Sequence, residues 1–120
     1  MTPEAFVDFE HTYPQRALNI AVSQSGYSTN TIAALDYMRA HDMAAVALTA
    51  NVEAPIKEHT DIVLDYGVGV ESVDFVTLGV EVLVEYLVLF GIYCGQARGT
   101  IDAKGVAQRL DDLREAIQAQ

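Results

Sequence analysis

The sequence predicts an α/β fold in which helices cover both faces of a parallel sheet, giving three layers. Three short apolar runs, each bounded by polar residues, have the length of buried strands: Leu18–Val22, Ala44–Leu48 and Ile62–Leu64. Helical segments separate these runs, and strands that alternate with helices form βαβ units with right-handed crossovers. In open sheets of this kind, ligands bind beyond the carboxyl ends of the strands.

The first half of the chain supplies the first strand and the first long helix. Within residues 1–16, the stretch Ala5–Phe9 fits either a short edge strand or a helical turn. The run Leu18–Val22 is continuous, which predicts a strand buried on both faces. The segment Ser28–His41 carries apolar residues at helical spacing. Three residues could cap this helix: Ser28, Thr29 and Asn30.

Three further helices follow in the second half. Pro55–His59 suits a short helix with proline at its start. Residues 73–97 predict a long helix that ends near Gly99. Ala103–Ala119 predicts an amphipathic helix. Its apolar stripe consists of Val106, Leu110, Leu113 and Ile117.

The composition bounds the function. The 120 residues are enough for one domain, and 17 acidic against 7 basic residues give a formal charge of −10. Nucleic acid is excluded as a partner, because binding it needs clustered Lys and Arg. A single cysteine, Cys94, excludes an internal disulfide and fits the cytoplasm. Phe75–Cys94 is apolar enough to suggest a membrane span, but Glu81 and Glu85 favour a buried or interface helix.

A hydroxyl-rich turn, Ser23–Ser28, lies between the first strand and the following helix. Such a turn presents backbone N–H groups and serine hydroxyls at the positive end of a helix dipole, which suits a phosphate. The alternative is an ordinary loop whose hydroxyls only cap the helix. The loops Thr49–Asn51 and Gly67–Glu71 follow the next two strands, so all three loops are expected at one edge of the sheet.

These loops resemble those of the SIS (sugar isomerase) domain family. The segment SQSGYSTNT at residues 23–31 is similar to the family's SQSGxTxDT signature, and Ala47–Asn51 looks like its "ITN" strand end. Residues 69–77 resemble the segment that opens the family's next long helix. The similarity spans about residues 6–118. It is greatest to bacterial two-domain phosphosugar isomerases and fructosamine-phosphate deglycases.

The resemblance implies a flavodoxin-like, five-stranded parallel sheet that binds a phosphorylated sugar or amino sugar and needs no metal or organic cofactor. It assigns the phosphate to four residues: Ser23, Gln24, Ser25 and Ser28. It assigns the rest of the substrate pocket to Gly26, Thr29, Asn51 and Asp74. Glu71 is the candidate general base, and the alternative is a solvated carboxylate at a helix N-terminus.

The chain also departs from the family pattern. The family begins with a strand and a GxGxS-type loop, which nothing before residue 1 supplies. We therefore expect a single partial SIS domain, truncated at its N-terminus, with a core at 16–101 and a C-terminal helix at 102–120. Leu78 stands where the family usually has lysine, and Tyr27 replaces a common glutamate.

The departures bear on catalysis, because in two-domain relatives the catalytic Glu and His come largely from the second SIS domain. The chain alone is expected to bind a sugar phosphate without catalysis, and to belong to an isomerase or deglycase. The alternative is a non-catalytic module for phosphosugar sensing or dimerisation. In either case the 73–97 helix is expected to contact a second copy or a second SIS domain, and no membrane is expected as a partner.

Overall fold

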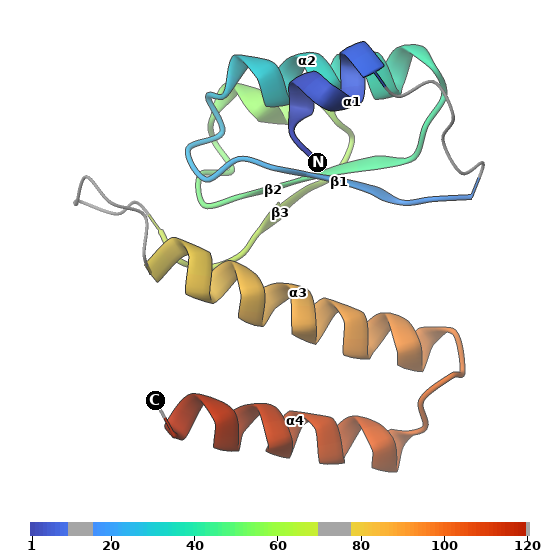
Figure 1. Cartoon of the computed structure of the whole chain (residues 1–120), viewed down its shortest axis with the longest axis vertical. Coiled ribbons are helices and arrows are strands. Elements are labelled where there is room, and N and C mark those ends of the chain that lie inside the picture. The colour runs from blue at the N-terminus through green and yellow to red at the C-terminus, as the bar shows by residue number, and fades with distance from the viewer. Residues whose placement is uncertain (10–15, 70–77, 120) are drawn as a thin grey trace. The chain divides into compact units, whose positions relative to one another are not determined.

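The computed structural model describes residues 1–9, 16–69 and 78–119 (Figure 1). The elements follow in the order α1 (Pro3–Phe9), β1 (Asn19–Val22), α2 (Thr29–Ala40), β2 (Ala45–Thr49), η1 (a 3₁₀-helix, Pro55–His59), β3 (Val63–Asp65), α3 (Leu78–Ala97) and α4 (Ala103–Gln118). The chain divides into two compact units, Met1–Gly79 and Val80–Gln120. The first unit contains the sheet.

The sheet is parallel and has the strand order β1-β2-β3. Asn19 pairs with Ala45 at the start of the β1–β2 ladder, and Ala47 pairs with Val63 in the β2–β3 ladder. The predicted α/β class with a parallel sheet is therefore confirmed. The described residues contain three strands, two fewer than the family resemblance implies.

The two neighbouring strands β1 and β2 differ in burial. β2 is the central strand, and Val46 to Thr49 are all buried. β1 lies at an edge, where Ala21 is buried but Val22 is 39% exposed and the preceding Leu18 is 50% exposed. The expectation that Leu18–Val22 is buried on both faces is wrong: Ala21 belongs to the core beneath the helices, whereas Leu18 and Val22 alternate with it and lie on the other face of the strand.

Three helical segments, α1, α2 and η1, lie on one face of this sheet (Figure 1). Ala5–Phe9 is helical rather than extended, and Pro3 provides the first residue of that helix. Apolar side chains from the helices and strands meet in one core. Its buried members are Ala21, Ala34, Leu35, Met38, Ala47, Ala54 and Ile56.

The second unit contains most of α3 and all of α4. The turn between them is closed by the amides of Thr100 and Ile101, which donate to the carbonyl oxygen of Gly95 at 2.9 and 3.2 Å. Asp102 caps α4, because its Oδ1 accepts from the Gly105 N–H at 2.7 Å. Of the predicted stripe on α4, Val106 is buried, whereas Ile117 is exposed.

Helix α3 has a mean hydropathy of 1.7 over its most apolar window and 20 residues, so length and composition alone would allow it to cross a membrane. Glu81 and Glu85 lie within it. Residues 73–77 of the predicted long helix lie outside the described residues. Several large apolar side chains of α3 are exposed: Leu78, Val80, Val84, Leu87, Val88 and Tyr93.

Candidate functional site

The carboxyl ends of the three strands bring three loops to one edge of the sheet. Ser23 follows β1, and its N–H donates to the carbonyl oxygen of Leu48 on β2 at 3.0 Å. Tyr66 follows β3, and its N–H donates to the carbonyl oxygen of Thr49 at 3.3 Å. Parallel pairing therefore continues to the ends of the strands. As predicted, the first residues of the three loops lie at the same edge.

The serine-rich loop is held by its own hydroxyl groups. Ser23 Oγ accepts from the Gly26 N–H at 3.2 Å, and Ser25 Oγ accepts from the Tyr27 N–H at 3.2 Å. Ser28 Oγ accepts from the N–H and the hydroxyl of Thr31, at 3.4 and 3.1 Å. In each case serine is the acceptor and keeps its own hydroxyl proton. Within the described part of the chain, these three protons have no acceptor, so each can be donated to a ligand.

Backbone N–H groups of the same loop are also available. Of the three candidate caps, Ser28 is the N-cap of α2, and the helix begins at Thr29. The first N–H groups of a helix have no partner in the helix itself. Among the described residues, those of Ser25, Thr29 and Asn30 have no acceptor. These donors and the positive end of the α2 dipole favour an anion at this edge, although residues 23–28 carry no charged side chain.

Gly26 joins the serine-rich loop to the segment before η1. Its φ is +73°, and its carbonyl oxygen accepts from the Ile56 N–H at 3.2 Å. A Cβ atom at this position would lie 2.5 Å from the Cβ of Ala54 and 3.2 Å from the carbonyl oxygen of Asn51. The contacts of Gly26 therefore fix the backbone of the loop, and only a residue without a side chain fits them.

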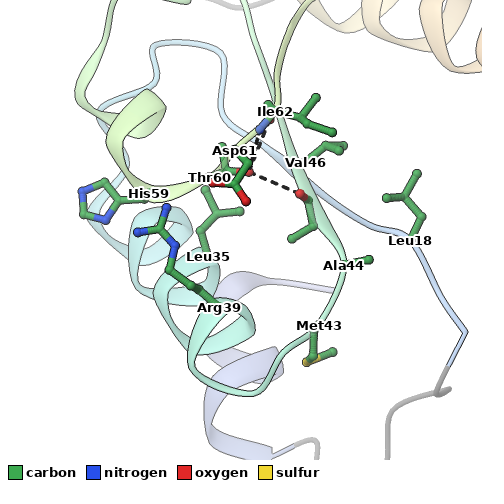
Figure 2. A pocket seen from close by; sticks show the side chains of 11 residues that line it. Leu18, Leu35, Arg39, Met43, Ala44, Val46, His59, Thr60, Asp61 and Ile62 are labelled. Atoms are coloured by element: carbon green, nitrogen blue, oxygen red, sulfur yellow. Dashed lines mark hydrogen bonds between the residues drawn. The ribbon is translucent and has the colours of Figure 1, made fainter.

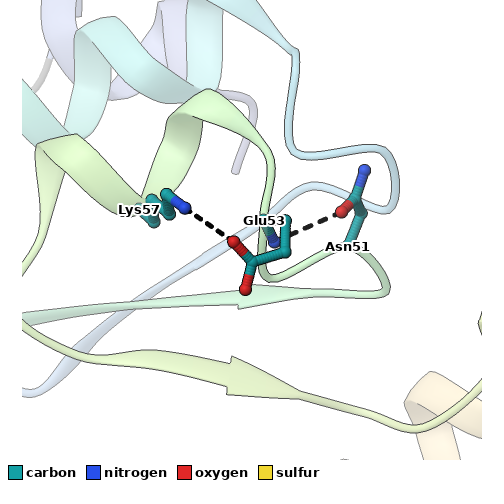
Figure 3. Close-up of polar contacts among 3 residues, drawn as sticks. All are labelled: Asn51, Glu53 and Lys57. Atoms are coloured by element: carbon teal, nitrogen blue, oxygen red, sulfur yellow. Dashed lines mark hydrogen bonds and ion pairs between the residues drawn. The ribbon is translucent and has the colours of Figure 1, made fainter.

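Asn51 lies in the loop after β2, next to Gly26. Its Oδ1 accepts from the Glu53 N–H at 3.2 Å, which closes a turn (Figure 3). The side-chain Nδ2 group has no acceptor among the described residues. The geometry therefore leaves Asn51 a donor for a ligand but commits its acceptor to the turn.

Glu53 and Lys57 form an exposed ion pair beside this turn, with 2.7 Å between Nζ and Oε2 (Figure 3). The hydrogen bond from Lys57, and its charge, hold the pKa of the Glu53 carboxyl below its ordinary value of 4.5. The same contacts raise the pKa of Lys57 above 10.5. Both groups are therefore charged at neutral pH, and the carboxylate offsets the field that the lysine would exert on an anion.

The predicted site residues divide into two sets. Six of them lie in the loops at the carboxyl edge, and Thr29 is the first residue of α2 at the same edge; the six are Ser23, Gln24, Ser25, Gly26, Ser28 and Asn51. Glu71 and Asp74 lie outside the described residues. No group of three or more His, Cys, Asp or Glu in the described ranges could hold a metal ion.

Two cavities are found away from the serine-rich loop. One, of about 270 Å³, lies at the amino end of β2 and is lined in part by Arg39, His59 and Thr60 (Figure 2). The other, of about 360 Å³, lies beside β1 and is lined in part by Phe6 and Met38. Neither has any of residues 23–28 in its lining, so the serine-rich loop is not part of either cavity.

Comparison with known proteins agrees with the resemblance seen in the loop sequences. A family model described as "SIS domain" matches residues 14–90. The chain belongs to the SIS domain family. The expectation drawn from residues 23–31 and the other loop motifs is thereby confirmed, and the matched range contains all three strands of the sheet.

Two curated relatives of this SIS domain are glutamine–fructose-6-phosphate aminotransferases (isomerizing). The protein from Caulobacter vibrioides is 31% identical over 100 residues, covering 83% of this chain and 16% of the relative. The protein from Symbiobacterium thermophilum is 36% identical over 111 residues, covering 92% of this chain and 17% of the relative. The chain therefore spans about a sixth of the length of the curated relatives that it matches.

A solved structure confirms the fold. A Clostridium difficile 630 protein, provisionally assigned as a phosphosugar isomerase, superposes with a TM-score of 0.89 over 98% of this chain. The match covers 34% of that protein at 22% sequence identity. At this identity the likeness establishes the fold and leaves the ligand to be argued from the residues themselves.

Proposed function

We propose that this SIS domain binds the phosphate group of a phosphorylated sugar or amino sugar at the loop 23–28 and the N-terminus of α2. One observation carries the proposal: Ser23, Ser25 and Ser28 each accept a hydrogen bond from the protein, and their hydroxyl protons have no acceptor among the described residues. The N–H groups of Ser25 and Thr29 add further donors. A phosphate offers acceptor oxygens to such a set of donors, and its charge is favourable at the start of a helix.

The rest of the substrate is proposed to lie against Gly26, Thr29, Asn51 and Asp74. Two relatives are named glutamine–fructose-6-phosphate aminotransferase (isomerizing), which supports a sugar phosphate as the ligand class. The complete protein is proposed to be an aldose–ketose isomerase or a deglycase, in which a base moves a proton between C1 and C2 of the sugar. Glu71 is the candidate base in this chain, with the remaining catalytic groups supplied by a second SIS domain.

Isothermal titration tests the binding site. The chain is titrated with fructose 6-phosphate, glucosamine 6-phosphate and inorganic phosphate, and unphosphorylated fructose is the matched control. We expect heat of binding with the phosphorylated ligands and none with fructose. Ser25→Ala removes one hydroxyl donor and should weaken binding about tenfold, because a hydrogen bond to a charged group contributes about 1.5 kcal/mol or more. An absence of binding at millimolar concentrations of every phosphorylated ligand contradicts the proposal.

A second candidate function is a non-catalytic module that senses a phosphosugar. It rests on the loop 23–28, which can bind a phosphate but carries no charged side chain for acid–base chemistry. A sugar-phosphate isomerase assay on the same preparation distinguishes the two. Binding without turnover, also in the presence of a second SIS domain, supports the sensor.

We also propose that α3 contacts a second copy of this chain or a second SIS domain. The exposed apolar side chains of Val80, Val84 and Leu87 support a protein contact, and Glu81 and Glu85 argue against a lipid one. Sedimentation of wild type and Val84→Glu tests the self-contact: a stable wild-type monomer at micromolar concentration contradicts it. The proposed compartment is the cytoplasm, and the chain is proposed to be one partial SIS domain with its core at 16–101.

A further inference from the structure

Thr49, the last residue of β2, is completely buried and yet polar. A valine would fill the same space without the cost of burying a hydroxyl, which is tolerated only when it is hydrogen-bonded. The hydroxyl of Thr49 has three such contacts, the longest of them to the carbonyl oxygen of Asn51 at 3.5 Å. It accepts from the Asn51 N–H at 3.1 Å, and it donates to the carbonyl oxygen of Gln24 at 3.1 Å. Thr49 thus connects the loop after β2 to the serine-rich loop, 25 residues earlier in the chain.

The carbonyl oxygen of Gln24 receives two donors, because the Ala50 N–H also donates to it at 3.1 Å. Both donors come from the end of β2, so this carbonyl points toward that strand. In a planar trans peptide the C=O and the following N–H point in opposite directions. The N–H of Ser25 therefore points away from β2, and it is one of the loop N–H groups that have no acceptor among the described residues.

Thr60, at the opposite end of the sheet, makes the same pattern of bonds. Its hydroxyl donates to the carbonyl oxygen of Ala45 at 3.2 Å and accepts from the Ile62 N–H at 3.4 Å (Figure 2). Its acceptor belongs to the first residue of β2 and not to the serine-rich loop. Thr60 is therefore a matched control, because it performs the same connection far from the candidate phosphate site.

We propose that Thr49 is a positioning residue for the phosphate site. Its hydroxyl holds the Gln24–Ser25 peptide in the orientation that directs the Ser25 N–H at the phosphate. This inference rests on the proposed function and deepens it, since it assigns a role to a residue that does not touch the ligand. Without the hydroxyl, the Gln24 carbonyl loses one of the two donors that the described part of the chain gives it, and the peptide can turn out of the binding orientation.

Four forms of the chain test this role: wild type, Thr49→Val, Thr49→Ser and Thr60→Val. Each is titrated with inorganic phosphate and with fructose 6-phosphate, and binding is followed by calorimetry and by the amide NMR signal of Ser25. We expect Thr49→Val to bind about tenfold more weakly, as for the loss of one hydrogen bond to an anion, and to lose most of the Ser25 shift. Thr49→Ser keeps the hydroxyl and should bind like wild type.

Thermal unfolding without ligand separates positioning from stability. Thr49→Val and Thr60→Val both remove a buried or half-buried bridging hydroxyl, so both should lower the Tm, but only the former should lower the affinity. The positioning role is overturned if wild type and Thr49→Val bind phosphate with equal affinity, or if both valine variants lose the same amount of affinity. Either result leaves the phosphate site itself intact. A wild-type chain that binds neither ligand overturns both proposals. If Thr49→Val does not fold, Thr49→Cys replaces it, since a thiol is a weak donor of similar shape.

Discussion

Replacing Gly26 with alanine tests whether the serine-rich loop depends on its packing against the segment before η1. A residue with a Cβ atom at φ +73° costs about 1 kcal/mol more than glycine. The new methyl group would also lie 2.5 Å from the Cβ of Ala54, which is completely buried and cannot move aside without shifting its backbone. Overpacking of this kind costs about 2 kcal/mol. The expected loss of unfolding free energy is therefore about 3 kcal/mol.

Gly67→Ala is the matched control for this substitution. Gly67 has a φ of +82°, but no atom of the described residues lies within 4 Å of the position of its Cβ. Gly67→Ala should therefore lower the unfolding free energy only by the backbone strain, about 1 kcal/mol. Urea denaturation followed by far-ultraviolet circular dichroism measures both losses. Pairing Gly26→Ala with Ala54→Gly should recover part of the loss. The packing explanation is refuted if Gly26→Ala is no more destabilising than Gly67→Ala.

Three further predictions concern charges and helix caps. Because Lys57 lowers the pKa of Glu53, the stabilisation from their pair is complete above the unfolded pKa and is lost as the pH falls through the lowered one, below 4.5. In an NMR titration, Lys57→Met should therefore raise the Glu53 pKa, and an unchanged value would exclude the pair in solution. Ser28→Asp should preserve the cap of α2 but abolish phosphate binding by repulsion. Ser28→Ala removes the cap and should cost about 1 kcal/mol of unfolding free energy. Equal phosphate affinity for Ser28→Asp and wild type would count against the site. In denaturant unfolding, Asp102→Ala should lower the unfolding free energy by about 1 kcal/mol, and Asp102→Asn should lower it much less. Equal losses of unfolding free energy in the two variants would show that the capping hydrogen bond contributes nothing.

The strands and the start of α2 could be predicted because their signals are local. Apolar runs bounded by polar residues located all three strands, and the series Ser28, Thr29 and Asn30 located the helix start to within two residues. The burial of β1 could not be predicted from the same run. Burial depends on what packs on each face of the sheet, and that is a property of the fold and not of the run.

The candidate site shows the same division. The serines and Gly26 could be predicted as site residues from one short segment, because its sequence resembles the SIS signature, and their role stays a proposal. The role proposed for Thr49 depends on a bond to Gln24, which no spacing within β2 reveals. The signal that the sequence offers for this role is a threonine at the end of an otherwise apolar strand. By itself, such a threonine could equally well be exposed to solvent.

The uncharged side chains of residues 23–28 have a consequence for association kinetics. The chain carries a formal charge of −10, so a phosphate dianion approaches against the overall field of the protein, and the loop offers only dipoles at short range. Added salt screens the repulsion over distances beyond about 10 Å, whereas the hydrogen bonds at contact are little affected. The association rate of a sugar phosphate should therefore rise with ionic strength, opposite to the behaviour of a site lined by lysine and arginine.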